Sequence, residues 1–215
     1  MIDSLKKILV LTAHSDDEMI CAGTLHRLAR QGARIQVVCF SPAATVEDRR
    51  GTEKSSTILR PEWERSMDLI GVAREDRYFL GMTPSADFQK FRQEICQTIF
   101  DLCEFERPDA VFTLSPDDEN VAHAIVGVES ERVLRGRVSY AIRCQYPWNF
   151  SMGRPNLFVK LDEQDLMCKK KVIAAYASQA FRYRYGEMLV HQCLADGMSV
   201  KVEAAEKFEL IRAVV

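Results

Sequence analysis

The sequence predicts an α/β fold in which helices cover both faces of a mostly parallel sheet. Residues 8–12 form a short run of leucine and β-branched side chains, which is typical of a strand that is buried on both faces. An amphipathic segment follows and ends at Gly32, and residues 33–40 form a second apolar run. A strand, a helix and a strand within about 30 residues are typical of a right-handed crossover between parallel strands.

The remainder of the chain continues to alternate between strands and helices. Residues 41–60 are polar and lack periodicity, which predicts a long loop after the second strand, and we expect this loop to act as a lid. Pro61 is expected in the first turn of the next helix. Further strands are expected at 77–80, 110–114, 138–145 and 157–161, and helices at 61–70, 88–105, after His123, at 162–177 and at 199–210.

The composition indicates one globular domain over residues 1–215 and argues against several classes of partner. The net charge of −2 and the lack of a basic stripe argue against nucleic-acid binding. No apolar run reaches the length of about 18 residues that a membrane span needs. The seven cysteines are scattered and form no Cys-x-x-Cys pair. Together with an amino terminus that lacks a signal-peptide core, they predict a cytoplasmic location.

Polar side chains follow two of the predicted strands at the point where each strand ends. His14, Asp16, Asp17 and Glu18 come directly after the first strand, and a second acidic loop that ends at His123 follows strand 110–114. The carboxyl ends of parallel strands meet at one edge of a sheet, where ligands bind in open α/β folds. Asp16 and Asp17 are equally compatible with an N-cap and a first-turn acid of the following helix.

Two histidines and one carboxylate from these loops suit a catalytic metal site. His14, Asp17 and His123 would supply three protein ligands and leave a coordination position open for water. Fe²⁺ accepts the same set as Zn²⁺, so the ligands leave the metal open between the two. Bound Zn²⁺ lowers the pKa of water from 15.7 to about 7. Asp16 lies next to the ligand Asp17 and is the natural base for that water.

Residues 13–18, Ala-His-Ser-Asp-Asp-Glu, closely resemble the Ala-His-Pro-Asp-Asp-Glu signature of the PIG-L/LmbE-like zinc N-deacetylases. Other pieces resemble the family in the same order along the chain. They are Glu62 before Leu-Ile-Gly71-Val, Phe79-Leu80-Gly81, Ser115-Pro116-x-Asp118, and a carboxyl-terminal segment with Lys169 and Tyr176-x-Ser178-Gln179. The agreement of five ordered pieces makes a chance match improbable.

The resemblance implies a Rossmann-like, three-layer α/β/α fold with a metal site at the carboxyl edge of the strands. It implies a mononuclear Zn²⁺ held by His14, Asp17 and His123, with Asp16 as the general base. The reaction that it implies is removal of an N-acetyl group from a small molecule or glycoconjugate that contains N-acetylglucosamine (GlcNAc).

The second metal motif departs from the family pattern. Where the family usually has His-Pro-Asp-His, this chain has Asn120-Val121-Ala122-His123. Asn120 can donate a hydrogen bond to an oxyanion, and we assign it that catalytic role, but it cannot supply a proton near pH 7. General-acid assistance is worth about 10²–10⁴-fold in rate. Either Asp16, Asp118 or Glu119 delivers the proton, or the protein is a deacetylase-like binder of metal or sugar with weak or no turnover.

The other candidates remain open from sequence. The loop 146–155 contains Trp148 and other aromatic residues, which suit a platform for an amino-sugar substrate, a cap on the core, or an interface in a homo-oligomer. The remaining histidines, His26 and His191, are expected to be surface or core residues without a catalytic role.

Overall fold

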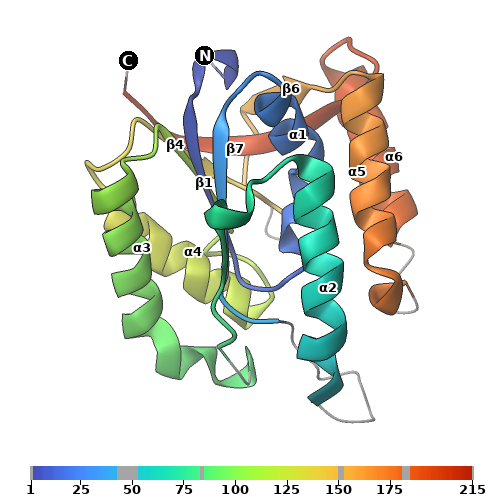
Figure 1. The fold of residues 1–215 in the computed structure, drawn as a ribbon. Helices are drawn as coiled ribbons and strands as arrows, with labels where there is room; N and C mark the ends of the chain where they lie inside the picture. Colours follow the sequence, from blue (N-terminus) through green and yellow to red (C-terminus); the bar gives the residue numbers. More distant parts are fainter. Residues whose placement is uncertain (1, 43–52, 83–84, 150–152, 181–184, 215) are drawn as a thin grey trace.

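The fold is described from a computed structural model that covers residues 2–42, 53–82, 85–149, 153–180 and 185–214. Its strands form one seven-stranded sheet with the order β3-β2-β1-β4-β5-β7-β6 (Figure 1). The strands are β1 (Lys7–Thr12), β2 (Arg34–Cys39), β3 (Arg77–Phe79), β4 (Ala110–Thr113), β5 (Tyr140–Arg143), β6 (Leu157–Lys160) and β7 (Ala205–Ala213). The first five are parallel, and β7 is antiparallel to both β5 and β6. The sheet is therefore mostly parallel, as predicted.

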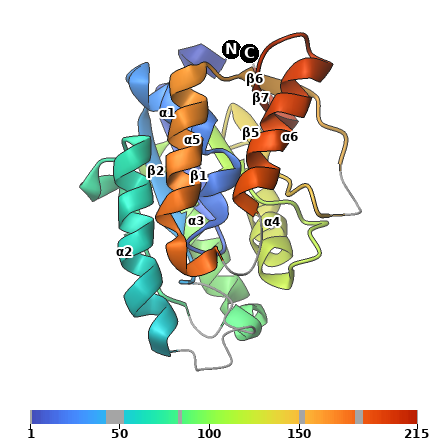
Figure 2. The same ribbon diagram turned by 90° about the vertical axis from the view of Figure 1, so that its right-hand side faces the viewer.

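Helices cover both faces of the sheet, which gives the predicted three layers. One layer contains α3 and α4, and the other contains α1, α2, α5 and α6 (Figures 1 and 2). The helices are α1 (Ala22–Arg30), α2 (Glu53–Ile70), α3 (Arg92–Glu106), α4 (Val121–Leu134), α5 (Glu163–Ala175) and α6 (Tyr185–Ser199).

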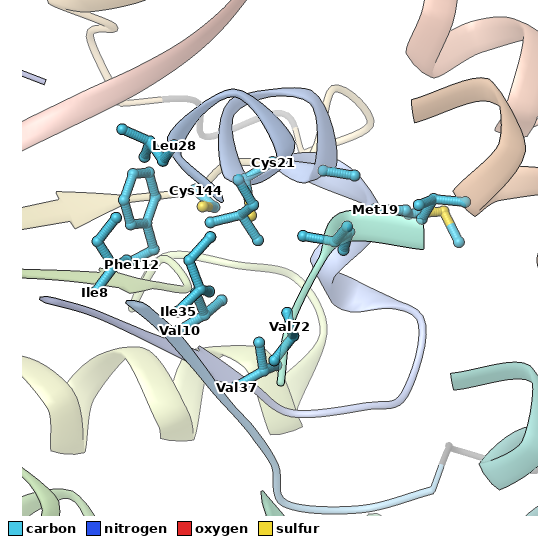
Figure 3. Packing of buried hydrophobic residues seen from close by; sticks show 14 of the residues in the cluster. Ile8, Val10, Met19, Cys21, Leu28, Ile35, Val37, Val72, Phe112 and Cys144 are labelled. Atoms are coloured by element: carbon cyan, nitrogen blue, oxygen red, sulfur yellow. The ribbon is translucent and has the colours of Figure 1, made fainter. Parts of the chain in front are cut away.

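A hydrophobic core lies on each face of the sheet, and these two cores explain the uninterrupted apolar run of β1. Ile8 and Val10 pack in the core beneath α1, and Figure 3 shows them close to Ile35, Val37 and Phe112. Leu9 and Leu11 pack in the second core, beneath α3 and α4. Successive side chains of a strand point to opposite faces, so a strand covered on both faces is apolar at consecutive positions, as β1 is from Ile8 to Leu11.

Helix α2 begins earlier than predicted, and Pro61 lies inside it rather than in its first turn. Residues 53–60, which were expected in a loop, belong to this helix. Of the remainder of the expected lid, residues 43–52 lie outside the described residues. Leu59 and Trp63 are buried at a spacing of four residues. This apolar stripe extends the helix past a proline whose interior position costs about 3 kcal/mol.

The prediction of a surface helix over 199–210 is wrong. Helix α6 ends at Ser199, and residues 205–213 form β7, which lies between β5 and β6. Phe208 of β7 is buried and packs edge-on against Phe112 of β4, with ring centroids 5.4 Å apart. This pairing joins segments nearly a hundred residues apart, so the local charge pattern gives no sign of it.

Three further features of the structure bear on the predicted helix 88–105, the cysteines and the possibility of a membrane span. The predicted helix 88–105 is divided into a 3-10 helix, Ser85–Phe91, and α3. All seven cysteines are free thiols. In the described part of the chain, each helix is too short or too polar to cross a membrane.

Candidate metal centre

The candidate site lies where the strand order of the sheet reverses, between β1 and β4. Such a switch point, outside the carboxyl ends of the strands, is where open α/β sheets bind ligands. After β1 the chain passes through His14 into a short 3-10 helix, Asp17–Ile20. After β4 it enters α4, which begins at Val121, so His123 lies within the first turn of that helix rather than before it.

The structure brings together the three residues that the sequence suggests as metal ligands. His14, Asp17 and His123 are buried, and one potential ligand atom from each lies within 4.8 Å of the others. His123 Nε2 is 3.1 Å from both His14 Nδ1 and Asp17 Oδ1, and His14 Nδ1 is 3.8 Å from Asp17 Oδ2. Tetrahedral coordination with bonds of about 2.1 Å separates ligand atoms by about 3.4 Å. The two separations of 3.1 Å and the separation of 3.8 Å to the second Asp17 oxygen bracket this value, so the three side chains are close enough to share one cation.

A second layer of hydrogen bonds orients His123. Its Nδ1 lies 3.1 Å from Asp118 Oδ2, which also accepts a hydrogen bond of 2.9 Å from Asn149 Nδ2. Asp118 Oδ1 accepts a hydrogen bond from the backbone N–H of Asn120. A proton on Nδ1 that faces Asp118 leaves Nε2 with its lone pair directed at the cluster, as a metal-ligating histidine requires. Sequence reasoning missed Asn149.

The electrostatics of the cluster favour a positive charge. Burial by itself would lower the pKa of His123, but the carboxylates of Asp17 and Asp118 outweigh it and raise this pKa to about 10. Burial would raise the pKa of Asp17, yet His123 and His14 hold it well below its usual range. The backbone N–H of His14 also donates to Asp17 Oδ2 at 2.7 Å. The site therefore holds a carboxylate in its charged form beside imidazoles that a cation would bridge.

Asp16 lies beside the cluster and does not serve as a helix cap. It occupies the N-cap position of the 3-10 helix, but its side chain makes no capping hydrogen bond. Burial and the neighbouring charge of Asp17 raise the pKa of its carboxyl group. A half-buried carboxylate with a raised pKa is suited to accept a proton.

Asn120 caps helix α4. Its Oδ1 accepts a hydrogen bond of 3.0 Å from the backbone N–H of Ala122, which is itself buried. Among the described residues, Asn120 Nδ2 has no hydrogen-bond partner, so this amide can still donate to another group. The predicted oxyanion donor thus has a structural role as well.

The last residue of the first motif, Glu18, points away from the cluster. Its Oε1 accepts hydrogen bonds of 2.5 Å from both Ser66 Oγ and Tyr176 OH. Burial raises the pKa of Glu18 to about 8. Glu18 therefore connects the loop after β1 to α2 and to the end of α5.

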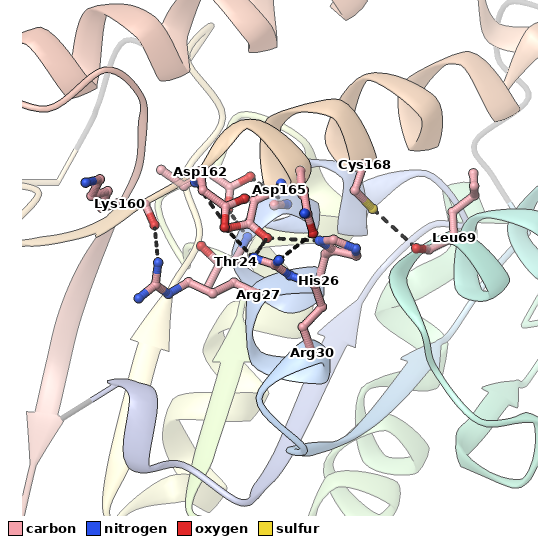
Figure 4. A network of polar contacts seen from close by, with 12 residues as sticks. Thr24, His26, Arg27, Arg30, Leu69, Lys160, Asp162, Asp165 and Cys168 are labelled. Atoms are coloured by element: carbon pink, nitrogen blue, oxygen red, sulfur yellow. Dashed lines mark hydrogen bonds and ion pairs between the residues drawn. The ribbon is translucent and has the colours of Figure 1, made fainter.

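The other two histidines lie outside the cluster. His26 Nδ1 is 2.9 Å from Asp165 Oδ1, in a network between α1 and α5 that Figure 4 shows. His191 is exposed on α6.

Trp148 stacks on Tyr146 with ring centroids 4.2 Å apart, and residues 150–152 of the aromatic loop lie outside the described residues.

Comparisons with solved structures show the fold. The chain is similar to N,N'-diacetylchitobiose deacetylase from Pyrococcus horikoshii, at 22% identity and a TM-score of 0.77, over 98% of this chain and 85% of that one. It is similar to a conserved protein from Thermus thermophilus at 20% identity and a TM-score of 0.79, over 97% and 96% of the chains. It is also similar to GalB, the 4-carboxy-2-hydroxymuconate hydratase from Pseudomonas putida, at 19% identity and a TM-score of 0.79, over 98% of each chain.

A comparison with protein families shows more than the fold. Residues 9–133 match the model of PIG-L, described as GlcNAc-PI de-N-acetylase. Comparison with curated protein sequences found no match. The matched segment covers more than half of the 215 residues and includes both loops that supply the candidate ligands. The chain therefore belongs to the PIG-L family.

Proposed function

We propose that the protein is a metal-dependent hydrolase that removes an N-acetyl group from a GlcNAc-containing small molecule or glycoconjugate. The observation that carries this proposal is the convergence of His14, Asp17 and His123 on one point at the ligand-binding edge of the sheet. The description of the family and the name of the Pyrococcus neighbour both indicate removal of an acetyl group from an acetylated amino sugar.

The three clustered residues would hold Zn²⁺, with Fe²⁺ as the other metal that suits this set. When bound, Zn²⁺ supplies a water whose pKa is lowered from 15.7 to about 7. The carboxylate of Asp16 takes the proton from the attacking water. Asn120 Nδ2 donates a hydrogen bond to the carbonyl oxygen of the substrate as negative charge develops there.

The proton balance must also account for the leaving amine. A C–O bond forms, the amide C–N bond breaks, and the products are acetate and the free amino sugar. Asn120 cannot supply the proton that the amine needs. In this proposal, Asp16 delivers to the leaving nitrogen the proton that it took from water.

The free thiols of the chain support a reducing compartment, which is consistent with a cytoplasmic substrate.

The proposal is tested by acetate release from a panel of N-acetylglucosaminyl conjugates, with the Zn²⁺-loaded protein and a chelator-treated control. Metal-dependent release of acetate is the expected result. Addition of water to a double bond, the reaction named for the Pseudomonas neighbour, releases no acetate and is thereby distinguished.

The substitution Asp16→Asn tests the base. It should leave metal content unchanged and lower turnover by about 10²–10⁴-fold, because the water loses its proton acceptor. Asp117→Asn is the matched control, since Asp117 is an exposed carboxylate on the loop after β4. Unchanged turnover in Asp16→Asn would show that another group is the base.

A second candidate is a deacetylase-like protein that binds metal or a sugar ligand with weak or no turnover. It is favoured by the use of Asn120 as a helix cap and by the apolar Ala122 beside it. A protein that binds stoichiometric metal but releases no acetate from any member of the panel would support this candidate over the hydrolase.

A further inference from the structure

We propose that Tyr146 is a positioning residue that holds Asp17 and His123 in the arrangement that binds the metal. This inference rests on the metal site of the proposed function. Tyr146 follows β5, the third strand whose carboxyl end reaches the site, and the residue is 3% exposed. It contacts two of the three clustered residues, one through its hydroxyl group and the other through the face of its ring.

The hydroxyl group constrains the side chain of Asp17. Tyr146 OH lies 3.0 Å from the backbone carbonyl oxygen of Asp17 and 3.1 Å from Asp17 Oδ1. Both are acceptors, so the phenol donates its single proton to this pair. Asp17 Oδ1 is also the oxygen that lies 3.1 Å from His123 Nε2. The hydroxyl therefore links the carboxylate to its own main chain and limits its rotation away from the cluster.

The ring constrains His123 in a complementary direction. The Tyr146 ring stacks on the imidazole with centroids 5.3 Å apart and an interplanar angle of 29°. Asp118 holds the same imidazole at Nδ1, in the plane of its ring. A contact in the plane and a contact on the face together restrict both the tilt and the rotation of the imidazole. Trp148 stacks on Tyr146 and supports it.

The test is the affinity of the purified chain for Zn²⁺, measured in competition with a chromophoric chelator. Tyr146→Phe keeps the stacked ring and removes only the hydroxyl group. Loss of a group that orients metal ligands typically costs 10–100-fold in metal affinity, and we expect a loss of about this size. Tyr146→Leu, which removes both contacts, should bind Zn²⁺ more weakly still.

Tyr140→Phe is the matched control, because Tyr140 is a half-buried tyrosine at the opposite end of β5. It should bind Zn²⁺ as the wild type does. Urea unfolding of the metal-free proteins shows whether each variant is folded under the conditions of the titration.

The outcomes separate this inference from the proposed function. If the wild type binds Zn²⁺ and folded Tyr146→Phe binds it with equal affinity, the positioning role is overturned and the metal site stands. The same holds if Tyr146→Phe lowers stability alone. A wild-type chain that binds no Zn²⁺ would overturn the metal site itself, and this inference with it.

Discussion

Two buried clusters of charged side chains meet the short 3-10 helix Asp17–Ile20, and they differ in how completely their hydrogen bonds are matched. One is the pair of Lys169, from α5, and Glu206, from β7. Lys169 Nζ donates to the backbone oxygens of Met19 and Ile20 and to Glu206 Oε1, at 2.6–2.8 Å. Its three protons thus have three acceptors.

Glu206 completes the match on the other side of the pair. Its carboxylate accepts hydrogen bonds from two backbone N–H groups in the first turn of α1, those of Gly23 and Thr24. Such N–H groups have no partner within their own helix. The pair is therefore complete without any further group.

The cluster of His14, Asp17 and His123 is not complete in this way. His123 Nε2 lies 3.1 Å from both His14 Nδ1 and Asp17 Oδ1, but a ring nitrogen carries at most one proton and cannot satisfy both. His14 Nε2 is buried and has no hydrogen-bond partner among the described residues. Lys169 and Glu206 therefore form a self-contained structural pair, whereas the cluster of His14, Asp17 and His123 keeps polar atoms without matching partners and is the candidate binding site.

The largest expected effect comes from removing a candidate ligand. His14→Ala should lose stoichiometric metal and all metal-dependent turnover. In the wild type, Zn²⁺ at 1,000 times its dissociation constant should raise the free energy of unfolding by about 4 kcal/mol, because it binds only the folded chain. The variant should show no such gain in urea unfolding with and without Zn²⁺. An equal gain in both proteins would place the metal elsewhere.

The next effect tests the matched pair. Lys169→Met should lower the free energy of unfolding of the metal-free protein by about 3–5 kcal/mol, because it leaves the Glu206 carboxylate buried without its cation. Lys169→Met/Glu206→Gln should recover part of this loss, since the unpaired charge is gone. Both are measured by urea unfolding.

The same variants test whether the pair of Lys169 and Glu206 is independent of the candidate metal site. If Lys169→Met is a structural change alone, its folded form should bind Zn²⁺ with the affinity of the wild type. A loss of metal affinity in the folded variant would mean that the pair also shapes the metal site through the 3-10 helix.

The smallest effect concerns Asp162, an exposed residue at the start of α5 (Figure 4). Its side chain accepts a hydrogen bond from the backbone N–H of Asp165, and Asp162→Ala should cost about 1 kcal/mol in urea unfolding. This hydrogen bond and the charge of Arg30 lower the pKa of Asp162 from 3.8 to about 2.

The pH dependence of that effect follows from the sign of the shift. A carboxyl group with a lowered pKa in the folded state stabilises the protein above its unfolded pKa, and the contribution is lost as the pH falls from about 4 to 2. The difference in stability between the wild type and Asp162→Ala should shrink over this range. A constant difference would assign the effect to helix propensity instead.

The parts of the fold that could be predicted from sequence depend on local patterns. The continuous apolar run of β1 indicates burial on both faces. The polar residues that come after β1 and β4 mark the ends of those strands. The start of α2 and the strand β7 could not be predicted. A proline is normally expected in the first turn of a helix, so Pro61 suggested a later start for α2 than the buried Leu59 before it supports. Strand β7 forms through its pairing with β5 and β6, which are distant in sequence.

The type of sheet, the edge at which the candidate site lies and the candidate ligands His14, Asp17 and His123 could all be inferred from the sequence. They could be inferred because neighbouring parallel strands have their carboxyl ends at the same edge of the sheet, so polar residues that follow two such strands lie close together. The tertiary structure was needed to show that Tyr146 contacts Asp17 and His123 and that Lys169 pairs with Glu206. These contacts join residues from about 20 to 150 positions apart. Patterns of apolar and polar residues within a helix or strand depend on near neighbours and cannot predict contacts at such separations.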